Sequence, residues 1–342
     1  MMKNIMIMAP LFTFLLLFTL PCLISSNIIS IRRNISITAF EKIPLPPKVT
    51  TTGGFTFDLF NKGPYIGVLD GRILKYNKIR RTFEDFAYTS PDRTSAFCDG
   101  TTNFNKLQIC GFPAGLSPDP ITGKIYVTDS SLGLDIVGNF GGLATNLVPS
   151  KDGVPYHTLN DLYAAINRKV YFVDASSIYN LRDINTSILT GDSTGKLLEY
   201  DSRTKVVVEL LTGLGAPAGV ASDSVASSIF VSEYAARRIQ KYYKKGDKAG
   251  NSEVILSGLG NPFHITRIKG EDDFWVPINN VVNETYANTQ AVKFNIDGQI
   301  LAILDLTREF SQLVTTVYQQ GNELYVTGLN TGYLGKYMLV YS

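Results

Sequence analysis

Histidine, tryptophan and cysteine are scarce in this sequence: its 342 residues include two histidines, one tryptophan and three cysteines. Two thiols without neighbouring histidines make a poor zinc cage, because a structural zinc site needs four such ligands. The chain also lacks any block of five like charges, and its 32 basic and 30 acidic residues leave a net charge of only +2. Its densest basic stretch, residues 237–248, is interpreted as a solvated hairpin tip rather than a phosphate-binding face. No nucleic-acid partner is expected.

The N-terminus does contain a long apolar run. Lys3 supplies a positive charge, residues 11–20 are apolar or threonine, and Pro21, Ser25 and Ser26 offer a helix break and small residues for cleavage. We therefore predict a signal peptide over residues 1–26. A membrane anchor is the alternative, although the run is short for a span of about 20 residues. No later stretch is apolar enough to cross a bilayer, so no membrane association is expected after cleavage.

Entry into the secretory pathway would place the cysteines in a compartment where disulfides form. Cys22 would leave with the signal peptide, and Cys98 and Cys110 would remain as an even pair in an oxidising compartment. We predict a disulfide between them, with a metal site as the alternative. A loop of this size contributes about 3 kcal/mol to stability in the chain-entropy model. Three sequons, at Asn34, Asn185 and Asn283, are predicted glycosylation sites.

One sequence pattern recurs six times along the chain: an aromatic residue inside a short β-rich run, followed by a turn. The six aromatic anchors are Tyr65, Tyr126, Tyr171, Phe230, Trp275 and Tyr325. Successive anchors are 61, 45, 59, 45 and 50 positions apart, the length of a four-stranded sheet with its loops. The repeat predicts an all-β protein, a single six-bladed β-propeller domain over residues 27–342.

Strand patterns lie between the repeats as well. Residues 196–201 and 206–211 are expected to be strands, and residues 291–306 a hairpin that turns at Asp297 and Gly298. The clearest helical candidate is residues 157–168, but its apolar positions are inconsistently spaced. A two-domain α/β protein would need strands alternating with helical periodicity, and that alternation is missing.

Long ordered segments of the chain resemble the plant strictosidine synthase-like family. They are "FTFDLFNKGPYIGVLDGRILKY", "FEDFAYTSPDRTSAFC", "ICG", "GGLATNLVPSKDGVPY", "VYFVDASSIYNLRD", "TGKLLEYDSRTK" and "DDFWV". The resemblance spans nearly the whole mature length and implies a six-bladed propeller. The spacing of Cys98 and Cys110 also matches the disulfide loop of that family.

The resemblance implies a condensation of an amine with an aldehyde, as strictosidine synthase joins tryptamine to secologanin. A glutamate of that family takes a proton from the amine and assists loss of water, a general acid–base role worth about 10²–10⁴-fold. Matching the last strand places Thr315 at the glutamate position and Leu313 at the position of a nearby histidine. A one-residue shift places Thr316 there instead. Glu309 lies six residues earlier, about 20 Å away along a strand. The machinery of the condensation is therefore expected to be lost.

Wider propeller relatives are calcium-dependent lactonases and esterases, and their ligand positions can be matched one by one. A glutamate position is Gly53 here, an Asn-Gly pair is Ala218-Gly219, and an asparagine position is His264. The pair Asn160-Asp161 survives. One or two oxygen ligands out of four do not make a calcium site, so no metal and no cofactor is expected.

A few remaining side chains are candidates for a pocket. His264 is the candidate catalytic base, because the pKa of histidine suits that role, although a hydrogen-bonded channel-lining residue is the simpler interpretation. Tyr179, Phe263, His264, Leu313 and Thr315 are the predicted pocket residues. Trp275 is expected in the core, and His157 in a structural or loop role. Two histidines also leave little choice of base for a serine hydrolase.

The sequence therefore predicts a glycoprotein whose channel binds a small, partly apolar plant metabolite, such as an amine or an aldehyde, in alkaloid-type metabolism. Any catalysis would act by positioning and desolvating the reactants, with His264 as the titrating group. The alternatives are a non-catalytic metabolite-binding or defence protein and a calcium-dependent hydrolase. The vacuole is the expected compartment, with the endoplasmic reticulum and the cell exterior as alternatives. The oligomeric state is not indicated.

Overall fold

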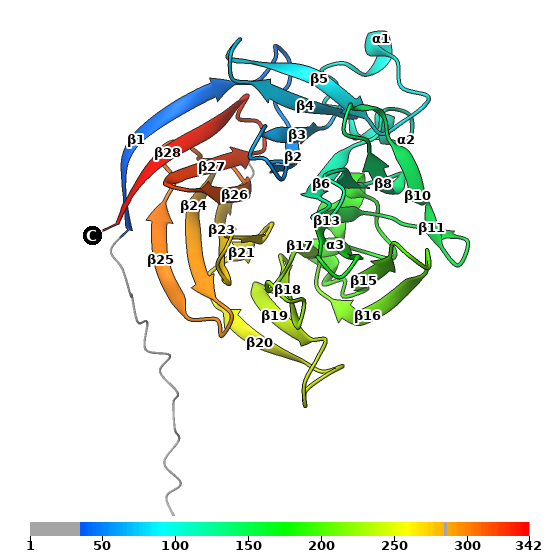
Figure 1. Ribbon diagram of the computed structural model, residues 1–342, viewed down its shortest axis with the longest axis vertical. Coiled ribbons are helices and arrows are strands. Elements are labelled where there is room, and N and C mark those ends of the chain that lie inside the picture. Colours follow the sequence, from blue (N-terminus) through cyan, green and yellow to red (C-terminus); the bar gives the residue numbers. More distant parts are fainter. Residues whose placement is uncertain (1–34, 284–285, 342) are drawn as a thin grey trace, which may run out of the picture.

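Six antiparallel sheets stand around a central axis, as the repeat predicted (Figure 1). The computed structural model describes residues 35–283 and 286–341. The predicted signal peptide and Asn34 lie outside these residues. In each sheet one strand lines the axis and the other strands step outward, which is the β-propeller architecture.

The first three blades contain the following strands. Blade 1 has β2 (Thr52–Thr56), β3 (Tyr65–Val68), β4 (Arg72–Asn77) and β5 (Thr82–Tyr88), with β9 (Gly142–Leu143) added in parallel to β5. Blade 2 has β6 (Pro113–Pro118), β7 (Ile125–Asp129), β8 (Gly133–Val137) and β10 (Thr145–Val148). A small ribbon, β11 (Ser150–Lys151) and β12 (Val154–Pro155), precedes blade 3. Blade 3 has β13 (Leu159–Ala164), β14 (Lys169–Asp174), β15 (Gly195–Asp201) and β16 (Val207–Leu214).

The remaining blades complete the ring. Blade 4 has β17 (Pro217–Ser222), β18 (Ser228–Glu233), β19 (Arg238–Tyr243) and β20 (Ser252–Ser257). Blade 5 has the split inner strand β21 (Asn261–Pro262) and β22 (Thr266–Arg267), then β23 (Asp273–Asn283), β24 (Tyr286–Asn295) and β25 (Ile300–Asp305). Blade 6 has β26 (Val314–Gln320), β27 (Glu323–Gly328), β28 (Tyr333–Tyr341) and, from the other end of the chain, β1 (Ile35–Pro44).

Pairing of β1 with β28 closes the ring. The two strands run antiparallel from Ile35 opposite Tyr341 to Pro44 opposite Tyr333, and they lie side by side at the outer edge of the last blade (Figure 1). Blade 6 is therefore built from both ends of the described chain, so opening the ring requires breaking a long strand pair.

All six aromatic anchors of the sequence repeat lie on the second strand of a blade, on β3, β7, β14, β18, β23 and β27. Each of them is less than 7% exposed, and Tyr171, Phe230 and Trp275 are fully buried. They pack in hydrophobic clusters between neighbouring sheets; Phe230 of blade 4, for example, lies 4.5 Å from Phe274 of blade 5 between ring centroids. The recurring aromatic is therefore the core residue of each blade.

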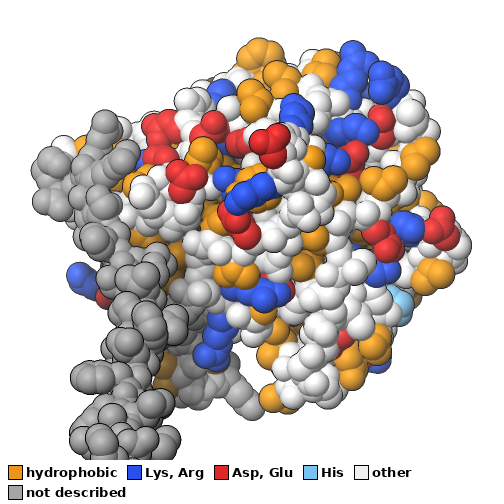
Figure 2. All heavy atoms as spheres, turned by 90° about the horizontal axis from the view of Figure 1, so that it is seen from below, with side chains coloured by type: hydrophobic (Ala, Val, Ile, Leu, Met, Phe, Trp, Pro, Cys, Tyr) orange, Lys and Arg blue, Asp and Glu red, His pale blue; other side chains and the backbone are white. Residues whose placement is uncertain are grey.

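Most local predictions are confirmed. The strands at residues 196–201 and 206–211 correspond to β15 and β16, and β24 and β25 form the hairpin at Asp297 and Gly298. The basic stretch lies in β19 and the turn to β20, as the hairpin interpretation predicted. The mixture of basic, acidic and apolar side chains on the face in Figure 2 agrees with the small net charge.

The helical candidate at residues 157–168 is wrong, because this segment contains the strand β13. Its backbone pairs with β14, from Leu159 opposite Asp174 to Ala164 opposite Val170. The ladder and burial between blades outweigh a weak local helical pattern. The helices in the described part of the chain are short: α1 (Ser95–Cys98), η1 (Phe104–Lys106) and α2 (Leu107–Cys110) before β6, and η2 (Leu181–Asp183) and α3 (Ile184–Thr190) before β15.

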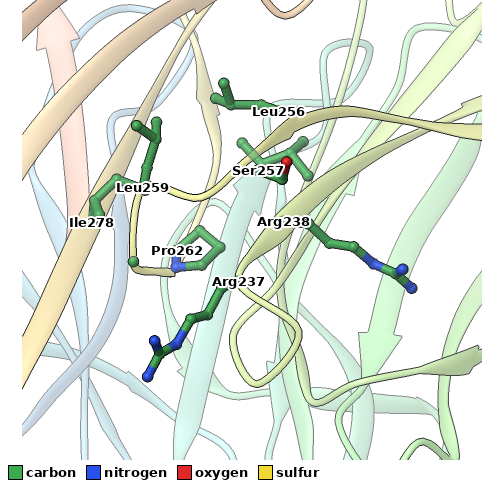
Figure 3. Close-up of a pocket in the computed structure, with 9 residues that line it drawn as sticks. Arg237, Arg238, Leu256, Ser257, Leu259, Pro262 and Ile278 are labelled. Carbon is green, nitrogen blue, oxygen red and sulfur yellow. The ribbon is translucent and has the colours of Figure 1, made fainter. Parts of the chain in front are cut away.

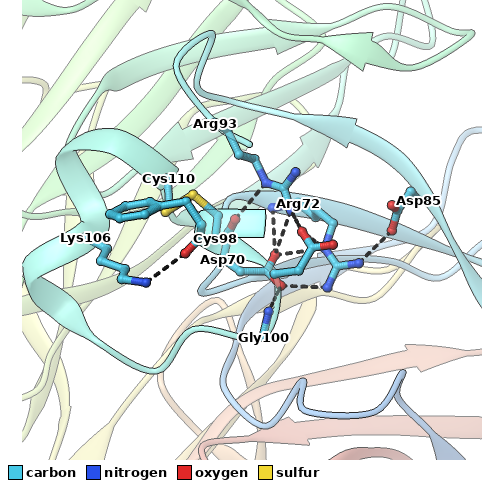
Figure 4. Close-up of polar contacts among 10 residues, drawn as sticks. Asp70, Arg72, Asp85, Arg93, Cys98, Gly100, Lys106 and Cys110 are labelled. Atoms are coloured by element: carbon cyan, nitrogen blue, oxygen red, sulfur yellow. Dashed lines mark hydrogen bonds and ion pairs between the residues drawn. A yellow bond between two sulfur atoms is a disulfide. The ribbon is translucent and has the colours of Figure 1, made fainter. Parts of the chain in front are cut away.

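The predicted disulfide between Cys98 and Cys110 is present, and both residues are fully buried. It joins the ends of α1 and α2. A charged network fastens the same loop to blade 1 (Figure 4): the carboxylate of Asp70 accepts from the backbone N–H of Gly100 at 2.8 Å and pairs with Arg72 at 2.6 Å. Arg93 donates to the carbonyl of Asp70 at 2.9 Å and pairs with Asp99. The loop is therefore held both by the disulfide and by ion pairs.

We predict that the double substitution Cys98→Ala/Cys110→Ala lowers the free energy of unfolding by about 3 kcal/mol, because the unfolded chain then loses a closed loop. Urea denaturation monitored by circular dichroism measures the change. Cys98→Ala alone, as a control, should lose the same amount. A double variant within about 0.5 kcal/mol of the wild type would show that the disulfide contributes little.

Candidate functional site

The inner strand of blade 5 is interrupted where it reaches the axis. Residues 263–265 lie between β21 and β22, and Pro262 just before them has no N–H to donate to a ladder. The backbone N–H of His264 donates instead to the carbonyl of Thr315 on β26, at 3.2 Å. This irregular segment directs the imidazole of His264 into the centre of the propeller.

His264 connects three blades through its ring. Its Nδ1 lies 2.9 Å from the Oγ1 of Thr316 in blade 6, and its Nε2 lies 3.0 Å from the Oδ1 of Asn160 in blade 3. We call these three residues the central triad. The imidazole thus joins Asn160 and Thr316, which are far apart in the sequence, across the channel. His264 itself is only 2% exposed.

The contacts of His264 define its protonation state. The amide oxygen of Asn160 can only accept, so Nε2 carries a proton and donates to it, and when the ring is neutral the hydroxyl of Thr316 donates to Nδ1. Burial lowers the pKa of His264 to about 3, because a charged imidazolium is disfavoured away from water. The side chain is therefore neutral at physiological pH, and both of its nitrogens are engaged.

The side chain of Thr315, which sequence matching assigned to the family glutamate position, bonds within blade 6 and toward Gly53 of β2 rather than to the triad. The pairing of β26 with β27 shifts register between Val314 and Thr316, and the Oγ1 of Thr315 lies 3.2 Å from the Oγ1 of Thr327 and 3.3 Å from the Thr327 carbonyl. Thr315 is 1% exposed. Leu313 precedes β26, and its carbonyl accepts from the N–H of Leu329 at 2.8 Å. Neither position offers a titratable group.

The two predicted aromatic pocket residues make different contacts. The ring of Phe263 packs 4.9 Å from the ring of His264 and 5.9 Å from that of Tyr234 between centroids. Tyr179 lies in the loop before η2, where its carbonyl accepts from the hydroxyl of Thr158 at 3.0 Å. Within the described residues the ring of Tyr179 makes no contact with the ring of Phe263. The sequence thus grouped residues that the fold brings together only in part.

Trp275 is core rather than pocket, as expected. It is fully buried, and its Nε1 donates to the Oε1 of Gln319 at 2.7 Å. Glu309 is directed away from the triad, and its carboxylate accepts from the hydroxyl of Tyr337 on β28 at 3.2 Å. His157 lies in the loop that precedes β13 and is partly buried.

Sequence analysis did not predict that Asn279 and Asp161 join neighbouring blades through hydrogen bonds. The amide of Asn279 clamps β26 to β23, accepting from the N–H of Val314 at 2.8 Å and donating to its carbonyl at 3.0 Å. The carboxyl of Asp161 accepts from the N–H of Val220 in blade 4 at 3.0 Å, and burial raises its pKa to about 8. The one sequence feature that could have indicated this role of Asn279 is its polar side chain within the mostly apolar run of β23.

The matched calcium positions do not fit a metal ion. The imidazole of His264 and the amide of Asn160 are bonded to each other. Gly53 has no side chain, and a Cβ there would lie 2.4 Å from the carbonyl oxygen of Pro113, so the backbones of β2 and β6 leave no space for a ligand. Among the described residues, His, Cys, Asp and Glu form no group of three or more that could hold a metal.

A small hollow and a G-x-S-x-G sequence match do not form functional sites. A hollow between β19, β20 and β21 has a volume of about 10 Å³, room for about one water, and the guanidinium groups of Arg237 and Arg238 point away from its apolar side chains (Figure 3). Residues 191–195, "GDSTG", match the pattern G-x-S-x-G. However, the pattern lies between α3 and β15, in the helix-to-strand order opposite to that of a nucleophile elbow.

Comparison with known proteins agrees with this architecture. A sequence profile of strictosidine synthase matches residues 160–247. Strictosidine synthase-like protein 11 of Arabidopsis thaliana is 36% identical over 309 residues, which cover 89% of this chain and 92% of the relative. The chain belongs to the strictosidine synthase-like family. Strictosidine synthase of Catharanthus roseus is 34% identical over 275 residues, covering 78% of this chain and 77% of that enzyme.

Solved structures resemble this family member in fold. A gluconolactonase from Xanthomonas campestris superposes with a TM-score of 0.63 at 14% identity, covering 90% of this chain and 95% of that one. The calcium-binding protein regucalcin from Agrobacterium tumefaciens has a TM-score of 0.61 at 13% identity, with 86% and 92% covered. At such identities the similarity concerns the propeller alone.

Two of the predicted glycosylation sites fall on described residues. Asn185 is exposed on α3, and the hydroxyl of Ser187 in the same sequon donates to the carboxylate of Asp192 at 3.0 Å. Asn283 is exposed at the end of β23. In the described part of the chain, no helix has the length and apolarity needed to span a bilayer.

We predict that the difference in unfolding free energy between the wild type and His264→Gln narrows as the pH falls from about 7 to about 4. The unfolded chain takes up a proton on His264 below about pH 6.5, whereas the folded chain takes it up only near its lowered pKa. Acid therefore favours the unfolded wild type, and the variant lacks this contribution.

Urea denaturation of both proteins across the pH range measures that difference. The buried carboxyls are common to both proteins and cancel in the comparison. His157→Gln is the matched control, because it removes the other histidine away from the triad. A constant difference across the range would show that His264 titrates alike in both states.

Proposed function

We propose that this chain binds a small, partly apolar plant metabolite at the mouth of its channel and no longer performs the carboxylate-assisted condensation of its family. Thr315 is the observation that carries the proposal. At the position of the family glutamate it presents a hydroxyl that is buried and bonded to Thr327. A general base must reach the proton that it removes, and no carboxylate stands at this position.

His264 does not replace the lost base. It is neutral because of its burial, and its ring nitrogens are hydrogen-bonded within the central triad. Protonating it as an acid–base catalyst would place a positive charge in the buried centre, where neither Asn160 nor Thr316 supplies a compensating negative charge. The ring of Phe263, packed against it and only partly buried, is the apolar surface that would meet a ligand.

The proposal includes the secretory pathway, with the vacuole as the expected compartment. The buried disulfide supports an oxidising compartment, and the exposed positions of Asn185 and Asn283 suit glycosylation. The calcium-dependent hydrolase is the weaker alternative, because Gly53 and the engaged Asn160 leave too few oxygen ligands.

We predict that the purified glycosylated protein, mixed with tryptamine and secologanin, forms strictosidine no faster than the uncatalysed mixture, because the proton acceptor is missing. Chiral liquid chromatography with mass spectrometry measures the product. Saturation-transfer NMR on the same sample should show that tryptamine binds and that Phe263→Ala weakens this binding.

Thr315→Glu and Thr315→Gln form a matched pair with and without a carboxylate. Strictosidine formed by Thr315→Glu but not by Thr315→Gln would support a pocket that lacks only its catalytic group. Acceleration by the wild type would contradict the proposal, and so would the absence of tryptamine binding.

A further inference from the structure

A hollow of about 300 Å³ lies between blades 1 and 2. Its lining comes from the loop at residues 58–62, from β3, β4 and β5 of blade 1, and from the turns at residues 121–125 and 138–139 of blade 2. This volume is at the lower end of the range for sites that bind small molecules.

The hollow is separate from the central triad. Gly54 lies beside the imidazole of His264, since a Cβ there would be 3.3 Å from Nδ1. Asp58, which lines the hollow, comes four residues later, in the turn that follows the end of β2 at Thr56, up to about 13 Å away at the usual rise of a strand. The hollow therefore opens where the inner strands end, on the face opposite the one where they begin.

Lys75 contributes a positive charge that the protein does not pair. Its ammonium lies 4.9 Å from the centroid of the Tyr65 ring and 5.4 Å from that of Phe86. Within the described residues it makes no hydrogen bond and no ion pair. The two rings cover one side of the ammonium, and its N–H donors remain free for a group in the hollow.

Aromatic and apolar side chains form the walls. Tyr65 and Ile125 are both 3% exposed and lie at the base, and the rings of Tyr65 and Phe86 pack edge to face at 4.9 Å. At the rim, Phe60 is 79% exposed and Ile121 is 48% exposed. An apolar body between these side chains would cover surface that water now contacts.

The charge balance of the lining favours an anion. Lys62 and Lys75 are its cations and Asp58 is its one carboxylate, which leaves a net charge of +1. The Asp58 carboxylate is already used, because it accepts from the backbone N–H groups of Phe60 at 2.9 Å and Lys62 at 2.8 Å. The hydroxyl of Tyr65 lies 3.4 Å from its other oxygen. Among the described residues, the ammonium groups of Lys62 and Lys75 are thus both unpaired cations of the hollow, and that of Lys75 lies against two aromatic rings.

We propose that this hollow is a second ligand site, which binds a small aromatic monocarboxylate. The carboxylate pairs with the ammonium of Lys75, and the aromatic body lies between Phe60, Phe86 and Ile121. The site goes beyond the proposed function, because it lies on the opposite face and takes an anion rather than an amine.

The probe for this site is trans-cinnamate, with trans-cinnamyl alcohol as its uncharged counterpart, both titrated calorimetrically into the full glycosylated protein. We expect saturable binding of cinnamate, and affinity for the alcohol lower by about tenfold or more, as for loss of a charge-assisted hydrogen bond. Lys75→Met keeps the apolar stem, and we expect it to weaken cinnamate binding by about the same factor. Lys78→Met removes a nearby exposed cation outside the hollow, and we expect less than about a twofold effect.

Tryptamine should not displace cinnamate, because the two ligands occupy opposite faces. The absence of saturable cinnamate binding would overturn the proposal. So would equal affinity for the alcohol, or wild-type affinity in Lys75→Met. Displacement by tryptamine would place the cinnamate at the channel mouth and overturn it as well. The first three of these outcomes do not depend on whether the channel mouth binds a metabolite, so they separate failure of this site from failure of the proposed function.

Discussion

Closure of the ring by β1 and β28 is the constraint on which the other features of this propeller depend. Once the six sheets form a closed ring, their inner strands converge on one axis, and residues that are distant in the sequence become neighbours. Space at the axis is limited, as the close approach of Gly53 to Pro113 shows. His264, Asn160 and Thr316 occupy that space and join blades 5, 3 and 6 through side chains.

Burial explains why a residue capable of acid–base chemistry has a structural role here. Away from water an imidazolium is costly, and the central triad offers His264 an amide oxygen and a hydroxyl rather than a carboxylate that would stabilise the charge. Thr315 is likewise held by the fold, because its buried hydroxyl bonds to Thr327 in the same blade.

The fold could be predicted from the sequence because its signals are local and repeated. Each blade places at least one buried aromatic residue on its second strand, and a local pattern that recurs six times reports this directly. The disulfide likewise follows from two nearby cysteines. Residues 157–168 show the limit, since the pairing of β13 with β14 decides their conformation.

The site was less predictable, because its contacts cross between blades. Sequence analysis identified His264, and identified Asn160 only as a remnant of a calcium site, but the hydrogen bond between them depends on ring geometry. Matching to the family predicted that Thr315 stands at the position of the glutamate, but it gave no indication of the direction of the Thr315 side chain. The unpaired ammonium of Lys75 could not be inferred either, because it depends on two rings brought together by β3, β4 and β5.

The most direct test of this account is the ¹⁵N NMR spectrum of the His264 imidazole, recorded from about pH 7 to about pH 4. The chain has only one other histidine, so a His157→Gln sample assigns the signals. The account predicts a neutral ring with its proton on Nε2 throughout this range, and a changed Nδ1 shift in Thr316→Val. Protonation of His264 near pH 6.5, the usual value for histidine, would contradict it.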